Sequence, residues 1–219
     1  MTHRASLLVI AKAPQAGRSK TRLCPPCTPE EAASLAEAAL SDTLAAVAMT
    51  PSPCRILVLD GPPGPWLPAG IEVLPQGQGG LDVRLAAAFA AAGGPALLIG
   101  MDTPQVGSAL LGEALAALAP RRVDAVLGMA VDGGWWALGL NDPDPDDLLG
   151  VPMSTPSTGA AQLARLLARG RRVHRLPSLR DVDRIDDARA VAASHPHTRF
   201  AARLDAFGYL ARQPTRSSA

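Results

Sequence analysis

Short, continuous apolar runs alternate along this chain with longer segments in which alanine and leucine are interrupted by charged residues. Apolar runs such as residues 5–11 and 95–100 are typical of strands that are covered on both faces of a parallel sheet. Thr28, followed by Pro29 and two glutamates, has the pattern of an N-cap and first helical turn, and it predicts a long helix that ends near Met49.

The rest of the chain continues this alternation of strand and helix patterns. Strands are expected at 5–11, 55–60, 71–74, 95–100, 124–130, 135–140 and 172–176, and helices at 28–49, 80–92, 108–118, 158–169, 186–193 and from about 197. This order predicts an α/β fold with a single, mostly parallel twisted sheet and helices on both faces. One nucleotide-binding domain is expected over residues 1–212, followed by a frayed tail at 213–219.

Composition and charge limit the kinds of partner. The chain of 219 residues is 47% hydrophobic, so it can bury a sizeable core. Its net charge of +1 provides no overall field for gathering nucleic acid or an anionic membrane surface. No apolar stretch is expected to span a membrane, and cysteines without a framework spacing favour a reducing, cytoplasmic setting.

A loop rich in cations follows the first predicted strand. Residues 11–23 contain one glycine, Gly17, and four cationic side chains, among them Lys12, Lys20 and Arg22. Backbone N–H groups and cations at the carboxyl end of a strand suit a polyphosphate. The spacing is neither that of a Walker A loop nor that of a Rossmann glycine motif, and a solvated basic loop is the alternative.

Carboxylates follow two other predicted strands. Asp102 comes directly after the run 95–100, and Asp132 begins an Asp-Gly-Gly turn before two tryptophans. Because ligands of such sheets bind outside the carboxyl ends of the strands, we expect these groups and the basic loop to converge. Asp102 suits a divalent metal or a helix cap. Asp132 suits the same crevice or simply a hairpin, and Trp135 could wall a pocket.

Two later polar groups have equally open roles. Ser154 and Thr155 could contact an acceptor or cap the helix expected at 158–169. Asp181 and Asp183 could supply a second metal ligand or a base, or cap the helix that follows them.

These motifs together resemble a known family. Ile10–Pro14, Gly17, Lys20–Leu23, Gly100–Pro104, Asp132–Leu140, Ser154–Thr155 and Asp181–Asp183 occur in this order, over roughly Leu7 to Ala190. The combination resembles the small bacterial GT-A-type glycosyltransferases grouped as DUF2064. The resemblance implies a nucleotide-diphospho-sugar transferase fold and a Mg²⁺ or Mn²⁺ cofactor. It assigns the opening loop to the nucleotide phosphates and Asp102 to the metal, and it would place Asp132–Trp135 at the sugar or acceptor side.

One departure from the fold group concerns the metal ligands. Glycosyltransferases of this fold usually carry Asp-x-Asp, whereas Asp102 is followed by Thr103 and Pro104. A second carboxylate must come from elsewhere, so Asp102 and Asp183 are expected as metal ligands, with Asp132 as a third catalytic carboxylate. The residues expected to bind the nucleotide or its sugar are Ala11, Lys12, Gly17, Lys20, Arg22, Thr103, Gly133, Gly134, Trp135 and Ser154.

Three functions are compatible with this pattern. The first is a glycosyltransferase that moves a sugar from a nucleotide-diphospho-sugar to a small-molecule acceptor. The second is a nucleotidylyltransferase that joins a nucleotide from an NTP to a small phosphate or phosphonate and releases pyrophosphate. The third is a nucleotide-binding protein without catalysis.

Three groups are expected to be structural. Cys24 and Cys27 form a C-x-x-C that could be a redox pair or half a zinc site, but incidental loop cysteines are favoured. The Asp- and Pro-rich segment 142–147 predicts a solvated loop. Arginines between Arg169 and Arg175 suit a helix end, with phosphate or acceptor binding as the alternative.

Overall fold

The computed structural model describes residues 5–119 and 123–210, so the tail expected at 213–219 lies outside the described residues. Within them, one sheet has the strand order β3-β2-β1-β4-β6-β5-β7. The strands are β1 (Ser6–Lys12), β2 (Arg55–Asp60), β3 (Glu72–Pro75), β4 (Ala96–Gly100), β5 (Ala125–Ala130), β6 (Trp135–Leu140) and β7 (Val173–Leu179). Only β6 runs antiparallel to its neighbours, which confirms the predicted mostly parallel sheet.

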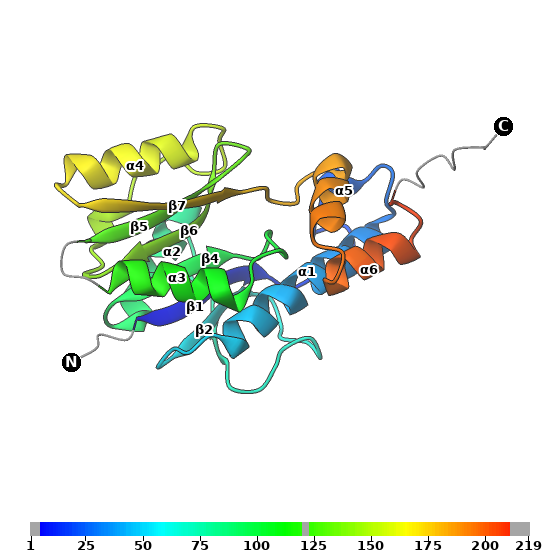
Figure 1. Cartoon of the computed structure of the whole chain (residues 1–219), viewed down its shortest axis with the longest axis horizontal. Coiled ribbons are helices and arrows are strands. Elements are labelled where there is room, and N and C mark those ends of the chain that lie inside the picture. Colours follow the sequence, from blue (N-terminus) through cyan, green and yellow to red (C-terminus); the bar gives the residue numbers. More distant parts are fainter. Residues whose placement is uncertain (1–4, 120–122, 211–219) are drawn as a thin grey trace.

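Helices cover both faces of this sheet, as predicted (Figure 1). They are α1 (Pro29–Met49), α2 (Leu81–Ala92), α3 (Ser108–Leu118), α4 (Thr158–Ala168), α5 (Ile185–Ser194) and α6 (Arg199–Ala206), with short 3-10 turns η1 (Thr21–Leu23) and η2 (Pro145–Asp147). Apolar residues of α1 and α3 form one core cluster with the strands, and those of α2 and α4 form a second cluster. The sheet is therefore the middle layer of three.

A third core cluster lies beyond the sheet. Helices α5 and α6 pack on the N-terminal half of α1, away from the sheet (Figure 1). Phe200 and Leu204 of α6 are buried there with Leu35 of α1 and Val182, which precedes α5. This packing places the segment between β7 and α5 at the carboxyl edge of the sheet.

Helix α1 begins as its sequence predicts. The Thr28 hydroxyl accepts from the Glu31 N–H, and the Glu31 carboxylate accepts from the Thr28 N–H, so a capping box holds the first turn. The sequence was expected to contain no apolar stretch of membrane-spanning length. That was wrong for α1, which is long and apolar enough to cross a membrane by length and composition alone. Half of its most apolar window is buried inside the protein, because its leucines and alanines pack on the sheet and on α6.

The strand β7 extends further than predicted. The sequence pattern predicted a strand over 172–176, and the next residue, Pro177, cannot donate to a ladder. The strand lies at the edge of the sheet, where one side of its backbone needs no partner, so proline is tolerated and pairing continues to Leu179. The Pro177 carbonyl accepts a hydrogen bond from the indole of Trp136, 2.9 Å away.

The segment 142–147 is only in part the solvated loop that its composition predicts, since Asp142 and Asp146 are exposed. Its last residue, Asp147, is completely buried in η2. The Asp147 carboxylate lies 2.7 Å from the guanidinium groups of both Arg169 and Arg171. The two arginines supply the opposite charge that allows a carboxylate to be buried, which also gives them a role beyond the helix dipole.

We expect Asp147→Asn to lower the free energy of unfolding by about 3 kcal/mol, because it leaves two guanidinium groups without their shared partner. Asp146→Asn is the matched control, since the Asp146 side chain is 70% exposed and its ion pair to Arg169 is longer, at 3.4 Å. Urea unfolding of both variants measures the difference. Equal midpoints for the two variants would show that the buried carboxylate is not stabilising.

Candidate functional site

A pocket of about 110 Å³ opens at the carboxyl edge of the sheet, where the sequence predicted a crevice. Its walls come from three segments: the residues after β4, the β5–β6 hairpin and the residue that follows β7 by two positions. The lining residues are Gly100, Asp102, Thr103, Ala130, Asp132, Gly134, Trp135, Trp136 and Asp181. Three carboxylates from distant parts of the chain thus share one pocket.

Lys20 ties the basic loop to this pocket. Its ammonium lies 2.7 Å from a carboxylate oxygen of Asp102, and it also donates to the Val182 carbonyl. The Lys20 side chain is only 10% exposed, whereas that of Asp102 is 48% exposed. The backbone of Lys20 is left-handed, with φ of 50°, which is uncommon for a residue other than glycine and recurs at functional sites.

The segment between β7 and α5 is held across the same edge. The Val182 N–H donates to the Asp102 carbonyl at 2.8 Å, and the Gln105 side-chain amide donates to the Arg180 carbonyl at 2.5 Å. Val182 itself is buried in the third core cluster. These contacts fix Asp181 beside Asp102.

The carboxyl of Asp181 is an unusually weak acid for an aspartate. Its burial and, to a smaller extent, the negative charge of Asp132 raise its pKa to about 6, while Lys20 acts in the opposite direction. The carboxylates of the pocket therefore lie close enough to repel one another.

Asp183 does not line the pocket, although it was expected as a metal ligand. Its carboxylate lies 2.7 Å from the guanidinium of Arg22, which is itself 66% exposed. Arg22 and Lys20 both have acidic partners in this structure. Lys12 is exposed at the end of β1 and forms no ion pair with the described residues.

The loop after β1 is built around a serine that the sequence pattern did not single out. The Ser19 hydroxyl accepts from the Gln15 N–H at 3.0 Å and donates to the Ala13 carbonyl at 3.3 Å. Gly17 has a positive φ of 74°, which its lack of a Cβ permits. Ala11 is buried in β1, and its carbonyl accepts a hydrogen bond from the Gln76 amide at 2.7 Å.

The hairpin turn packs directly on the start of α4. The Asp132 carboxylate accepts from the Gly134 N–H at 2.7 Å, so this residue forms the turn as well as lining the pocket. A Cβ on Gly133 would lie 1.8 Å from the Pro156 carbonyl oxygen. Ser154, which was expected to bind ligand, lies outside the pocket lining and has a positive φ of 59°.

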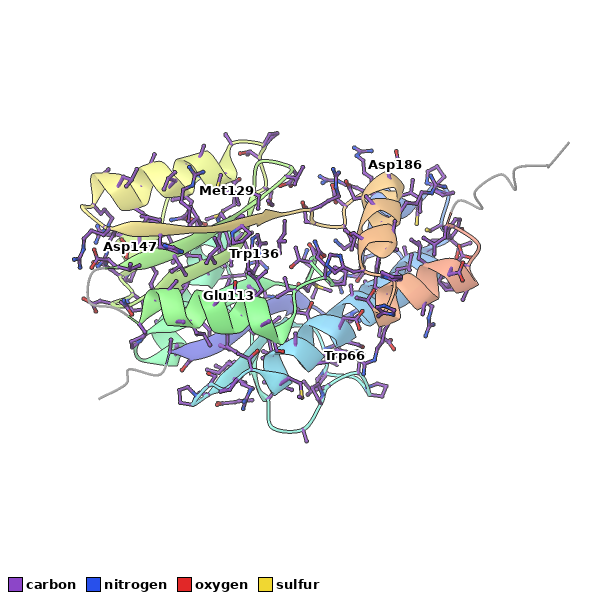
Figure 2. The ribbon with its side chains drawn as sticks, in the orientation of Figure 1. Trp66, Glu113, Met129, Trp136, Asp147 and Asp186 are labelled. Atoms are coloured by element: carbon purple, nitrogen blue, oxygen red, sulfur yellow. The ribbon has the colours of Figure 1, made fainter. Side chains whose placement is uncertain are left out.

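The two tryptophans after the turn have different surroundings. Trp136 is buried in the core cluster of α1 and α3, and Figure 2 shows it between β7 and α3. Its ring occupies the space above Gly128, where a Cβ would lie 2.4 Å from the indole nitrogen. Trp135 packs at the border of the opposite cluster, and its indole nitrogen has no hydrogen-bond partner among the residues that the structure describes.

Cys24 and Cys27 are free thiols beside the start of α1. Burial raises the pKa of both, and the negative charge of glutamates in the first turn of α1 adds to the effect. Redox exchange and zinc binding both require the thiolate, which a raised pKa disfavours. Incidental loop cysteines stay the favoured interpretation.

The donor set of the pocket fits a hard divalent cation. Among residues 5–119 and 123–210, no group of three or more His, Cys, Asp or Glu side chains is close enough to enclose a metal. Mg²⁺ commonly takes only one or two protein carboxylates, with phosphate oxygens completing its shell. Asp102 and Asp181 satisfy that requirement, and the Thr103 hydroxyl beside them is buried without a partner.

The raised pKa of Asp181 makes a pH-dependent prediction. An acid whose folded pKa lies above its unfolded value of about 3.9 destabilises the folded state increasingly as the pH rises from the unfolded to the folded pKa, and fully above the folded pKa. We expect Asp181→Asn to raise the Tm of the metal-free protein at pH 8, and to raise it less at pH 5, where the native carboxyl is mostly protonated. Asp183→Asn, which only breaks the pair with Arg22, is the control. A Tm gain that is the same at both pH values would contradict the assignment.

Solved structures share this fold. A protein from Desulfovibrio desulfuricans G20, provisionally assigned as a nucleotide-diphospho-sugar transferase, is 23% identical, covers 94% of this chain and 96% of its own, and superposes with a TM-score of 0.83. Rv0371c from Mycobacterium tuberculosis H37Rv, solved with manganese, is 21% identical over 87% of this chain and 99% of its own, with a TM-score of 0.51. A cytidylyltransferase from Leptospira borgpetersenii is 10% identical over 96% and 98% of the two chains, with a TM-score of 0.56.

Identities this low show the shared fold and not a shared activity. The fold is that of nucleotide-diphospho-sugar transferases and nucleotidyltransferases. No protein with a curated description matches the chain. Residues 32–155, more than half of the chain, match the family described as "Uncharacterized protein conserved in bacteria" (DUF2064). This chain therefore belongs to the DUF2064 family, as its motifs indicated.

Proposed function

We propose that this chain is a metal-dependent glycosyltransferase, which moves a sugar from a nucleotide-diphospho-sugar to a small-molecule acceptor. One observation carries the proposal: Asp102, Asp132 and Asp181 line a single pocket beside a basic loop whose Lys20 pairs with Asp102. The carboxyl edge of an α/β sheet is where such folds bind ligands.

The residues of the loop and pocket have separate tasks in this proposal. Lys12, with Lys20 and Arg22, would offset the charge that develops on the leaving nucleoside diphosphate. Asp102 and Asp181 would hold the divalent cation, with Asp181 in place of Asp183. When bound, a Mg²⁺ or Mn²⁺ ion supplies further positive charge to the diphosphate. Asp132 belongs to the β5–β6 hairpin, where the acceptor or the sugar would be positioned.

Lys20 has a second task in the absence of ligand. It neutralises Asp102 at 2.7 Å, which limits the repulsion among the three carboxylates of the pocket. The arrival of a cation and a diphosphate would give Asp102 and Lys20 new partners of opposite charge. We extend the proposal to residues 1–212 as one nucleotide-binding domain in the cytoplasm, because Lys20 of the loop after β1 pairs with Asp102 in a pocket whose lining reaches Asp181 after β7.

A nucleotidylyltransferase is the second candidate, and one observation favours it. Asp102 is not part of an Asp-x-Asp pair, and the other pocket carboxylates come from segments that are far away in the sequence. In this reaction a small phosphate or phosphonate would attack the α-phosphate of an NTP, and pyrophosphate would leave.

Thermal unfolding with a panel of nucleotides separates the two candidates. The panel contains UDP-, GDP- and dTDP-sugars and the four NTPs, each with and without Mn²⁺. We expect a Mn²⁺-dependent rise in Tm of about 5 °C or more with one nucleotide-sugar at roughly 100 times its Kd. A rise with NTPs alone, followed by pyrophosphate release, would overturn the glycosyltransferase in favour of the second candidate. No rise with any of them would favour a protein without this chemistry.

A further inference from the structure

Two residues that line the pocket each have a buried side-chain polar atom without a hydrogen-bond partner among the described residues. These atoms are the hydroxyl oxygen of Thr103 and the indole nitrogen of Trp135. Thr103 is only 2% exposed, and both residues line the pocket. Because buried polar groups in native proteins are nearly always hydrogen-bonded, a bound molecule is the natural source of the missing partners.

The chemistry of the lining limits what that molecule can be. An indole N–H only donates, so it needs an oxygen acceptor. The carboxylates of Asp102, Asp132 and Asp181 only accept when ionised, so they need donors. Hydroxyl groups both donate and accept, whereas a carboxylate or phosphate on the ligand would only accept.

The charge of the pocket also favours a ligand with hydroxyl groups over one with a carboxylate or a phosphate. Three carboxylates line the pocket, and Lys20 is paired with one of them, Asp102. Under the proposed function, a divalent ion would add positive charge, but the diphosphate of the donor would share that charge. A further negative group on the transferred sugar would meet excess negative charge at short range.

The size of the pocket restricts it to one part of the donor. Sites that enclose whole drug-sized ligands typically measure about 300–1,000 Å³, and this pocket is about 110 Å³. It therefore suits a single small ring, while the nucleotide would extend along the loop after β1.

We propose that this pocket holds the sugar of the donor and selects a neutral, hydroxyl-rich hexose over a uronic acid or a phosphorylated sugar, with Thr103 and Trp135 hydrogen-bonding to the sugar hydroxyls. The inference rests on the proposed function, since it concerns the sugar of the donor. It adds the charge class of that sugar and two residues that recognise it.

The test uses the full chain with Mn²⁺ and measures Kd by calorimetry. The ligands are UDP and GDP, and two sugar pairs that differ only at C6: UDP-glucose with UDP-glucuronic acid, and GDP-mannose with GDP-mannuronic acid. We expect the hexose of at least one pair to bind about ten-fold or more tighter than its uronic acid, a difference of about 1.4 kcal/mol.

Two conservative variants test the residues. Thr103→Val keeps the shape of the side chain and removes its hydroxyl, and Trp135→Phe keeps an aromatic ring of smaller size and removes the indole N–H. Each should weaken hexose binding by about three- to ten-fold, the usual worth of one hydrogen bond, and leave the bare nucleoside diphosphate unaffected. Thr103→Val should also keep or raise the Tm of the free protein, because it removes an unsatisfied buried group.

Thr43→Val is the matched control for stability. Thr43 is also completely buried, but its hydroxyl donates to the Ala39 carbonyl at 3.0 Å within α1. This variant should lower the Tm and leave sugar binding unchanged.

The outcomes separate the two proposals. If UDP or GDP binds but each uronic acid binds as well as its hexose, or if both Thr103→Val and Trp135→Phe bind the hexose normally, the sugar inference is overturned and the proposed function stands. If UDP, GDP and their sugars do not bind with Mn²⁺, and dTDP-glucose does not bind either, both proposals are overturned.

Discussion

Replacing Asp102 by asparagine is expected to weaken Mn²⁺-dependent nucleotide binding by about 100-fold or more, the effect of losing several kcal/mol of metal coordination. Asp102 lines the pocket and carries the ion pair to Lys20 at 2.7 Å. Asparagine keeps the size of the side chain and removes the charge, so the fold should persist. Calorimetric titration of the nucleotide, with and without Mn²⁺, measures the loss.

The controls locate the effect in the pocket. Asp146→Asn changes an exposed carboxylate, and Figure 2 shows its neighbour Asp147 at the opposite end of the molecule from α5. It should bind the nucleotide normally. Asp181→Asn should weaken metal-dependent binding strongly, and Asp183→Asn should weaken it only slightly, because Asp183 faces Arg22 instead of the pocket. Unchanged binding by Asp102→Asn would refute the metal assignment.

Replacing Gly133 by alanine is expected to lower the free energy of unfolding by about 4 kcal/mol or more, since a strained backbone and an overpacked contact add together. The φ of Gly133 is +94°, and the added Cβ would lie 1.8 Å from the backbone oxygen of Pro156. Neither backbone can move freely, because the Gly159 N–H donates to the Gly133 carbonyl at 2.8 Å.

Gly134→Ala is the control for this prediction. Its Cβ would lie 3.0 Å from a side-chain oxygen of Asp132, which can rotate away. Urea unfolding should show a much smaller loss for Gly134→Ala than for Gly133→Ala. Equal losses would show that contact with Pro156 does not fix the turn, and a Gly133→Ala protein of normal stability would contradict the described packing.

The convergence of the site was predictable because strand ends are a property of topology. The apolar runs that end at Lys12 and Gly100 indicated central parallel strands, and the carboxyl ends of such strands share an edge. Asp102 follows one of these runs directly. The turn at Asp132 was also predictable, because two glycines follow this aspartate.

The local sequence pattern could not predict which of Asp181 and Asp183 lines the pocket. Both flank Val182, and both precede α5 at positions suited to capping. Burial of Val182 among α1, α5 and α6, and its hydrogen bond to the Asp102 carbonyl, decide which aspartate lines the pocket. Those contacts join residues from distant parts of the chain, so no short window of sequence contains them.

Two ion pairs were missed for the same reason. Lys20 was expected to contact phosphate, and its partner Asp102 lies far along the chain. Asp147 sits in a segment whose composition predicts solvent exposure, and its burial depends on Arg169 and Arg171 after the next helix. A polar segment is therefore expected to be exposed only if no side chains of opposite charge from elsewhere in the chain pack against it.

The central claim is that the pocket of Asp102 and Asp181 binds a divalent cation together with a nucleotide. Anomalous diffraction from crystals of the full chain grown with Mn²⁺ and the nucleotide that raises Tm most tests it directly. The account predicts one manganese peak within coordination distance of Asp102 and Asp181, with phosphate oxygens completing its shell. A peak at Asp183, at another site, or none beside a bound nucleotide would contradict it.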